Sequence, residues 1–393
     1  MSERWLMYDC RVRTKLSAVQ NDHTPYVSAP PEAPPGGRVI EPVPLGRPGV
    51  VALARSFYRK HGKKLWWLHS LYALGLGLGV VFVAQKGFDQ ARWLSVSLVI
   101  AWLLVVGFFR LFGSGKEQAA VEAGGAKAKL RFYAVTYVIK NLYQGMLFFL
   151  LPFYWKSASV GTINSVFVAV LAVCAIVSTV DLVVDRVLLR WRVLAGFFHA
   201  LTLFASLNLV IPALFPETRT VVSLLLAAGI TALGFWTLNL RLSSLRNRWL
   251  VGGILLSVAA SVLGAWFARS VIPPVPMYVS RSAVGPMLLP DGRLAMEVKT
   301  LHPSVIRELT AVTDVVVPGG KGDRLIHVWR HDQAVVHRAT EDTSRVSGPH
   351  GAVRLRSTLQ GSALPRALVG GWHVEVETED GQLVGRAAFT VAD

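Results

Sequence analysis

The sequence predicts an α-helical membrane bundle of seven transmembrane helices, followed by an all-β, Ig-like antiparallel sandwich. Three observations support this. Long apolar segments recur between residues 55 and 270, Lys and Arg gather between alternate pairs of them, and short strand-like runs follow. Hydrophobic residues make up 52% of the 393-residue chain, and its mean hydropathy is +0.44. Such values are high for a water-soluble protein and typical of several membrane spans.

Residues 1–54 precede the first apolar segment and are rich in Pro and Gly, as in "APPEAPPGGRVIEPVPLGRPG". No helical or strand period is sustained there. We therefore expect a disordered cytoplasmic leader.

The domain expected at residues 55–270 contains seven apolar segments, each long enough to cross a hydrocarbon core of about 30 Å. Trp and Tyr lie at many of their ends, as is usual at membrane interfaces. The segments are 65–84, 93–109, 132–153, 163–184, 193–215, 221–240 and 249–267.

The flanking charges predict how these segments are oriented. Sixteen Lys and Arg residues lie in residues 55–64, directly before the first segment, and in the connections on the same side, against four in the opposite connections. Because positive residues favour the cytoplasm, the N-terminus is expected there and the C-terminus outside after seven crossings. For a bacterium with two membranes this indicates the inner membrane, with the lipid bilayer as partner and a periplasmic C-terminal domain.

The net charge of +17 belongs to residues 1–270, because residues 271–393 carry 13 Lys and Arg against 13 Asp and Glu. The excess follows the positive-inside pattern, and no basic and aromatic surface module accompanies it, so no nucleic-acid partner is expected. Cys10 and Cys174 are the only cysteines, which excludes a disulfide framework.

Residues 275–393 are predicted to form the sandwich, because short alternating runs are separated by turn residues. Trp372, Val374 and Val376 are expected to point inward, with Glu375 and Glu377 on the wet face. The last two runs are predicted to pair as a hairpin around "EDGQ". The seven runs are "RLAMEVKT", "TAVTDVVV", "RLIHVWR", "AVVHRA", "AVRLRSTL", "WHVEVET" and "LVGRAAFTV".

The runs "LIHVWRH" and "GGWHVEVETEDGQLVGRAAFTV" resemble the closing motifs of a bacterial family, the domain of unknown function 2914. Upstream, "KNLYQGMLFFLLPFYWKSAS" resembles the multi-span membrane region often fused to it. The resemblance covers the chain from about Leu65 and implies an uncharacterised inner-membrane family with no established reaction. Asp332-Gln333 departs from the Asp-Gly expected after His331, which suggests a looser turn.

Polar residues inside the apolar segments form the first candidate site. Lys140, Asn141 and Gln144 belong to the third segment, Asp181 and Asp185 to the fourth, and His199 to the fifth. One interpretation is a cytoplasm-facing pocket that binds an anion, a proton or a lipid headgroup. The other is a set of interhelical hydrogen bonds with a snorkelling lysine. In either case we expect Asp181 to neutralise Lys140, with Asn141 and His199 completing the hydrogen bonding.

The second candidate is a partner-binding surface of the sandwich that includes His327, Trp329, His331 and Trp372. For the two tryptophans the sandwich core is favoured over a sugar-stacking platform. No metal site is expected, because His327 and His331 would lie about 13 Å apart along one strand.

The sequence contains no G-x-S-x-G, Walker, H-E-x-x-H or C-x-x-C motif, so neither a catalytic site nor a cofactor is expected. The favoured function is a non-enzymatic envelope protein whose sandwich binds a partner while the bundle anchors or senses. The alternatives are a transporter or lipid-handling protein that uses the polar pocket, and an intramembrane enzyme. The oligomeric state is left open.

Overall fold

The computed structural model describes residue 75 and residues 91–112, 124–180, 183–188, 190–240, 246–289, 294–339 and 352–393. All of them belong to one compact unit, His61–Asp393. The predicted leader lies outside the described residues, as does the first predicted span except for Gly75, which is helical.

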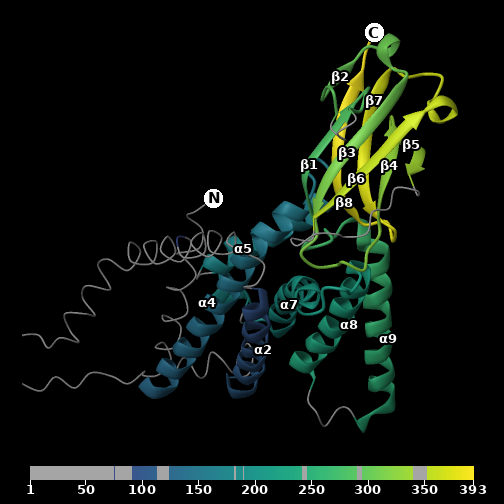
Figure 1. The fold of residues 1–393 in the computed structure, drawn as a ribbon. Coiled ribbons are helices and arrows are strands. Elements are labelled where there is room, and N and C mark those ends of the chain that lie inside the picture. Colours follow the sequence, from purple (N-terminus) through teal and green to yellow (C-terminus); the bar gives the residue numbers. More distant parts are fainter. Residues whose placement is uncertain are drawn as a thin grey trace, which may run out of the picture. The chain divides into compact units, whose positions relative to one another are not determined.

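Six long helices in the described ranges correspond to the second to seventh predicted spans (Figure 1). Four of them contain stretches that are long and apolar enough to cross a membrane, namely Leu130–Ser157, Val193–Leu214, Thr220–Asn239 and Arg248–Ser270. The apolar parts of the other two, Val96–Phe112 and Asn164–Thr179, are shorter. The six helices are α2 (Ala91–Phe112), α4 (Ala126–Ser157), α5 (Asn164–Thr179), α7 (Arg192–Leu214), α8 (Thr220–Asn239) and α9 (Arg248–Phe267).

Helix α5 is shorter than the predicted span at 163–184, because it ends at Thr179. The hydroxyls of Ser178 and Thr179 donate to backbone carbonyls three residues earlier, at 2.6 and 2.7 Å. Such bonds compete with the helical backbone ladder. A π-helical turn, η2 (Val184–Leu188), follows, and a single 3₁₀ turn, η4 (Ala268–Ser270), extends α9.

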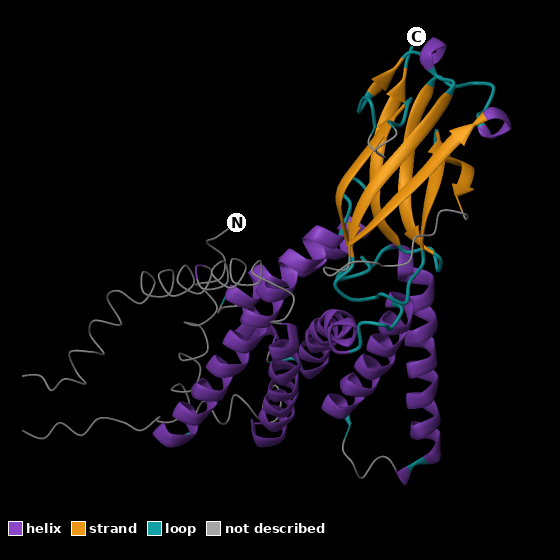
Figure 2. Ribbon diagram, viewed as in Figure 1, coloured by secondary structure: helices purple, strands orange, loops and turns teal. Residues whose placement is uncertain are grey.

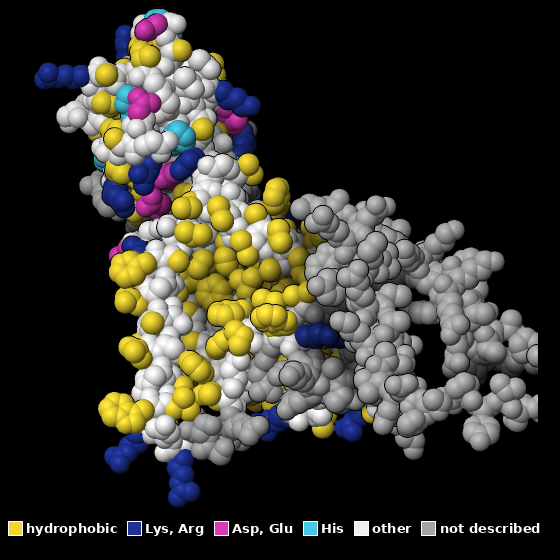
Figure 3. Space-filling model, turned by 180° about the vertical axis from the view of Figure 1, so that it is seen from behind, with side chains coloured by type: hydrophobic (Ala, Val, Ile, Leu, Met, Phe, Trp, Pro, Cys, Tyr) yellow, Lys and Arg dark blue, Asp and Glu magenta, His cyan; other side chains and the backbone are white. Residues whose placement is uncertain are grey.

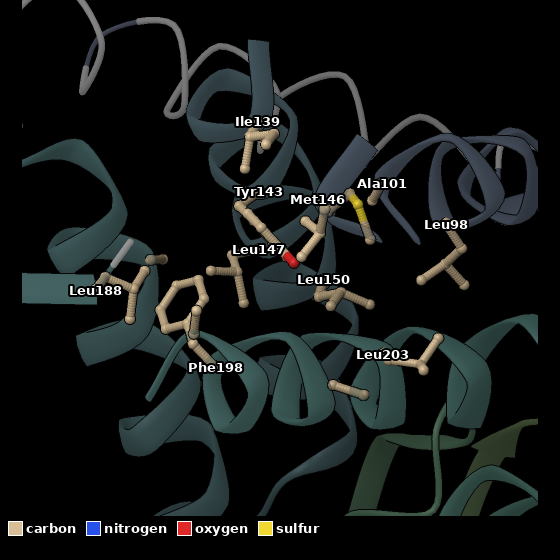
Figure 4. Close-up of a cluster of buried hydrophobic side chains, with 14 of the residues drawn as sticks. Leu98, Ala101, Ile139, Tyr143, Met146, Leu147, Leu150, Leu188, Phe198 and Leu203 are labelled. Carbon is tan, nitrogen blue, oxygen red and sulfur yellow. The ribbon is translucent and has the colours of Figure 1, made fainter. Parts of the chain in front are cut away.

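Helices α2, α4 and α7 pack around the largest hydrophobic cluster. Helix α8 packs between α7 and α9. Figure 4 shows Leu147 of α4 and Phe198 of α7 in this cluster, with Leu98 of α2 and Leu188 of η2 on opposite sides of it. Outward-facing side chains of the helices remain apolar, and Figure 3 shows hydrophobic residues gathered over the helical region. A helical region whose outer surface is apolar is typical of a protein embedded in a membrane.

The C-terminal region forms two sheets, with strand orders β1-β3-β6 and β2-β8-β7-β4-β5 (Figure 2). All pairs are antiparallel except β2 with β8. The strands are β1 (Tyr278–Gly285), β2 (Thr300–Leu301), β3 (Glu308–Val316), β4 (Leu325–His331), β5 (Ala334–Ala339), β6 (Ala352–Gln360), β7 (Gly370–Thr378) and β8 (Leu383–Val391), with 3₁₀ turns η5 (Pro303–Val305) and η6 (Gly361–Ala363).

Six of the seven predicted strands appear, as β3 to β8. The strand predicted at 293–300 is wrong: in its described part only Leu294, which bridges to Leu288, and the last residue, Thr300, which begins β2, are paired. Strand β1 was not predicted. The hairpin of β7 and β8 is confirmed, and Gly381 occupies its turn at φ +83°, a conformation that glycine adopts without strain.

The inner faces of the two sheets enclose shared hydrophobic cores, one of which joins Leu309 and Leu359 to Trp329, Trp372 and Phe389. Trp372, Val374 and Val376 point inward, as predicted. The expectation that Glu375 and Glu377 face water needs correction, because only 3% and 7% of these residues are exposed.

The outer face of the five-stranded sheet explains this burial. Arg330 donates from Nε to Glu375 at 2.5 Å and from Nη2 to Glu377 at 3.3 Å. Arg386 covers Glu375 from β8 with two further hydrogen bonds. The carboxylates are therefore outward-facing but shielded from water by paired guanidinium groups.

Candidate functional site

The ammonium-bearing side chain of Lys140 is buried inside the helical bundle. Lys140 is 7% exposed and Gln144, one helical turn later, is 4% exposed. They share a face of α4 with Ile139, Tyr143 and Leu147, which are also buried, because residues three and four apart lie together on a helix. Lys140 Nζ lies 5.9 Å from the centroid of the Tyr137 ring, within reach of a cation–π interaction.

His199 of α7 meets the same face of α4. Its Nδ1 shares a hydrogen bond of 2.5 Å with the hydroxyl of Tyr143, and the two rings meet edge to face. His199 is 1% exposed. Among the described residues, no group hydrogen-bonds to its Nε2. A buried ring nitrogen without a hydrogen bond is costly, and it marks a position where a ligand or proton could be accepted.

The structure brings only part of the predicted polar pocket together. Asp181 lies outside the described residues, and Asp185 belongs to η2 but its side chain is outside the described part. The amide of Asn141 donates to the Tyr137 carbonyl of its own helix at 2.8 Å. The Lys140–Asp181 ion pair therefore stays a prediction.

Tyr143 was not among the predicted site residues, and neither was a second polar contact further along α4 and α7. Tyr154 donates to the carbonyl of Ala205 at 2.9 Å, and the amide of Asn208 donates to the Tyr154 hydroxyl at 3.2 Å. Tyr143 and Tyr154 lie 11 residues apart, close to three helical turns, and so share a helix face with Lys140 and Gln144. This spacing could have identified both tyrosines from the sequence as members of the same polar face.

A second polar site connects α8 to the C-terminal region of two sheets. We call this region, which contains β1 to β8, the β domain. Asp323, in the loop between β3 and β4, accepts hydrogen bonds through Oδ2 from the amide and the hydroxyl of Thr220, both at 2.8 Å. Thr220 is the first residue of α8, and the preceding Arg219 makes no side-chain capping bond. Since the first amides of a helix lack acceptors within it, Asp323 caps α8 from another domain. Its negative charge also suits the helix N-terminus.

Arg219 surrounds this cap with ion pairs. Its Nη2 lies 2.8 Å from Asp380 and 3.4 Å from Glu379, and its Nε lies 4.0 Å from Asp323. From the end of α9, Arg269 donates through Nε to the carbonyl of Asp380 at 2.7 Å. We call Arg219, Thr220, Arg269, Asp323, Glu379, Asp380 and Gln382 the junction cluster.

Glycines allow the backbones to approach closely beside the junction cluster. A Cβ on Gly322 would lie 2.3 Å from the carbonyl oxygen of Glu217, and one on Gly319 would lie 2.7 Å from that of Pro212. Lys321 donates its amide to the carbonyl of Pro216 at 2.7 Å. The sequence "PGGKGD" is therefore a docking loop as well as a turn.

Asp323 is perturbed by this environment. Burial raises its pKa to about 6, with a smaller push from Asp380, while the hydrogen bonds from Thr220 and the charge of Arg219 oppose the rise. The Thr220 hydroxyl also lies 2.7 Å from Oε1 of Gln382, so its one hydrogen faces two acceptors. This competition is consistent with the raised pKa, because protonation of Asp323 removes one of the two acceptors that face the Thr220 hydroxyl hydrogen.

Three of the four predicted partner-binding residues of the β domain are buried in its core, and the fourth is partly exposed. His327 is 2% exposed, and its Nδ1 and Nε2 share hydrogen bonds with Ser357 at 2.8 Å and Thr313 at 3.1 Å. Burial lowers its pKa to about 4. Trp329 and Trp372 are fully buried, which places both indoles in the core and out of reach of a surface partner.

Only His331 of this set is partly exposed, at the C-terminal end of β4. Its ring packs on that of Trp372 at 4.6 Å between centroids, and its Nε2 lies 3.1 Å from the carbonyl oxygen of Val369. Asp332 and Gln333 follow with φ of +46° and +74°. Within the described ranges, no three His, Cys, Asp or Glu residues come together as a metal site would require.

Comparison with protein families gives two matches. Residues 52–308 match a family of unknown function, DUF5924, and residues 322–391 match a protein of unknown function, DUF2914. The resemblance to the latter family is thereby confirmed. No curated protein matches the chain. The boundary between the matches lies inside the β domain, because β1 and β2 belong to the first match and β4 to β8 to the second.

Proposed function

The chain belongs to the DUF5924 family of unknown function, and from its geometry we propose a non-enzymatic protein of the bacterial inner membrane. Its periplasmic, Ig-like β domain binds an envelope partner, and its seven-helix bundle anchors that domain and senses the bound state. The N-terminus is cytoplasmic and the C-terminus periplasmic. The candidate membrane-spanning helices and the match of the C-terminal region to a family of unknown function support this proposal.

Charge and hydropathy support the orientation. Arg246 and Arg248 lie at the start of α9, on the side where the positive-inside pattern puts the cytoplasm. The opposite helix ends carry the β domain, through the junction cluster. Alkaline phosphatase fused after Asp393 is expected to be active, and fused after Arg246 inactive. The reverse pattern would overturn the orientation.

The observation that carries the sensing role is the cap of α8 by Asp323. A domain tethered by a flexible linker would move without affecting the helices. Here, buried hydrogen bonds and ion pairs tie the β3–β4 loop and the β7–β8 turn to α8 and α9. Displacement of the β domain by a partner therefore changes the interactions at two helix ends, which supplies a physical link between binding and the bundle.

A photo-crosslinking residue in the full chain tests partner binding in cells. At Val335, which is 45% exposed on strand β5, it is expected to give one discrete adduct with an envelope component. At Trp249, which is 90% exposed at the start of α9, the same residue is the control and is expected to give lipid adducts alone. Identical adduct patterns at the two positions would count against a binding role of the β domain.

The second candidate function is that of a transporter or lipid-handling protein using the pocket around Lys140, Asp181 and His199. It is favoured by one observation: Lys140 of α4 and His199 of α7 are both buried, and the described residues leave Nε2 of His199 without a hydrogen bond. Ionisable groups inside membranes are costly and are usually kept for a function.

Lipid analysis of a deletion strain separates the two candidates. The second predicts an altered lipid profile that the natural chain restores and the Lys140→Met variant does not. An unaltered lipid profile, or full restoration by Lys140→Met at equal protein levels, would show that the polar residues serve helix packing and not lipid handling.

A further inference from the structure

A groove of about 380 Å³ runs between α4 and α5. Its apolar walls include Leu151 and Pro152 of α4 and Val168 and Ala172 of α5. The small side chains of Ala169 and Ala172 leave room on α5, and Pro152 lines the groove from α4.

One end of this groove is cationic. Lys156, in the last turn of α4, lines it together with the exposed indole of Trp155. The ammonium of Lys156 lies 5.7 Å from the centroid of the Tyr278 ring, and among the described residues no carboxylate lies within ion-pair distance of it. A Lys beside a Trp at the end of an apolar helix is the usual arrangement at the level of lipid headgroups.

We propose that the groove between α4 and α5 binds an anionic phospholipid of the surrounding bilayer. One acyl chain lies along Leu151, Val168 and Ala172, and the phosphate accepts a charge-assisted hydrogen bond from Lys156. The combination of an apolar channel with a cation at one end matches an anionic lipid and not a free phosphate, which would gain nothing from the apolar walls. The site rests on the membrane location of the helices and is independent of partner binding by the β domain.

A larger groove of about 440 Å³ between α7, α8 and α9 has no cationic residue in its lining. It is lined by aromatic and small residues with a few hydroxyls, including Phe235, Trp236 and Ser257, and by no charged side chain. Nothing in its lining distinguishes an anionic lipid from a neutral one, so it serves as the internal comparison.

The test is native mass spectrometry of the full chain in detergent with phosphatidylglycerol or phosphatidylcholine added. Phosphatidylglycerol is expected to be retained about fivefold better than phosphatidylcholine, the preference that one basic residue near a membrane surface provides. Lys156→Gln is expected to abolish this preference. Ala172→Trp fills the groove and is expected to reduce retention of both lipids, and its matched control is Val173→Trp, at the adjacent position, which faces outward and is 59% exposed.

A preference for phosphatidylglycerol that survives Lys156→Gln would overturn the proposal. Equal retention by Ala172→Trp and Val173→Trp would also overturn it. If Ala172→Trp does not elute as a folded protein, Ala169→Phe, at the more open edge of the groove, replaces it under the same criteria. The phosphatase fusions described above report membrane orientation separately, so a failed lipid test leaves that result standing.

Discussion

The carboxylate of Asp323 and the first residue of α8, Thr220, are bonded twice across 103 positions of sequence, from amide and hydroxyl to the same oxygen. This contact makes the start of a candidate membrane helix dependent on a loop of the β domain. It also buries a carboxyl group whose neighbours include Arg219 and Asp380. Its consequences can be measured.

Replacing Asp323 by Ala is expected to destabilise the detergent-purified chain by about 1–3 kcal/mol, because α8 loses its cap and the amide of Thr220 loses its buried acceptor. Thermal unfolding followed by circular dichroism measures the change. The control is Glu297→Ala, which removes an exposed partner of Arg281 and is expected to cost less than about 1 kcal/mol. Equal losses in the two variants would contradict the capping role.

Asp323 is also expected to make stability fall as pH rises from about 4 to about 6. Its folded pKa is raised to about 6, above the usual value of about 3.9, so the folded chain binds the proton more tightly than the unfolded chain. This stabilising contribution is complete below about pH 4 and is lost as pH rises through about 6. Asp323→Asn, which imitates the neutral form, is expected to remove this loss; unchanged pH profiles would disprove it.

His327 is expected to have the opposite effect in almost the same range. Its folded pKa is lowered to about 4, below the usual value of about 6.5, so the unfolded chain takes up the proton first. Its contribution is complete above pH 6.5 and is lost as pH falls toward 4. His327→Gln keeps polar atoms between Ser357 and Thr313 without the charge, and it is expected to flatten acid destabilisation in melting temperatures from pH 4 to 7. Comparison with Asp323→Asn separates the two groups.

The segment that matches DUF2914, residues 322–391, is expected to remain unfolded when it is expressed alone. It lacks β1 and β3, which supply two of the three strands of one sheet and, through Leu309, part of the core around Trp329. Residues 275–393 contain all eight strands and are expected to unfold cooperatively. Far-UV circular dichroism and thermal unfolding of the two fragments provide the measurement, and a folded 322–391 fragment would refute the prediction.

The predicted pairing of Lys140 with Asp181 is testable by a double-mutant cycle. Lys140→Met or Asp181→Asn alone leaves one buried charge unpaired and is expected to cost about 3–5 kcal/mol, whereas the double variant should recover part of this loss. The melting temperature of the purified chain is the readout. Additive losses would show that the two charges do not meet.

The strands β3 to β8 could be predicted from sequence because alternation and turn residues are local signals. Strand β1 was missed, although "YVSRSAVG" pairs with β3 along its length, since it follows the proline-rich end of the helical region. The run "RLAMEVKT" has strand-like alternation, but the described part of it forms only a bridge at Leu294 and the first residue of β2. Alternation indicates a preference and cannot show whether a neighbouring strand exists.

The residues of the candidate sites also differ in whether the sequence could predict them. Lys140, Gln144 and His199 stand out because polar residues are rare in apolar segments, and the structure buries all three. Tyr143 was missed because a tyrosine within an apolar helix cannot be distinguished by sequence from other aromatic core residues. The junction cluster gave no signal, since Thr220 and Asp323 are common polar residues at helix and loop boundaries and only the tertiary fold brings them together.

The cap on α8 also constrains the order in which the chain can mature during synthesis. Thr220 leaves the ribosome 103 residues before Asp323 and 162 before Gln382, the two side chains that its hydroxyl contacts. At synthesis rates of about 5–20 residues per second, the first turn of α8 therefore waits roughly 5–30 seconds for its acceptors. Helix α8 is therefore synthesised before its cap can form, and the contact between Thr220 and Gln382 forms only after the β7–β8 turn has been made.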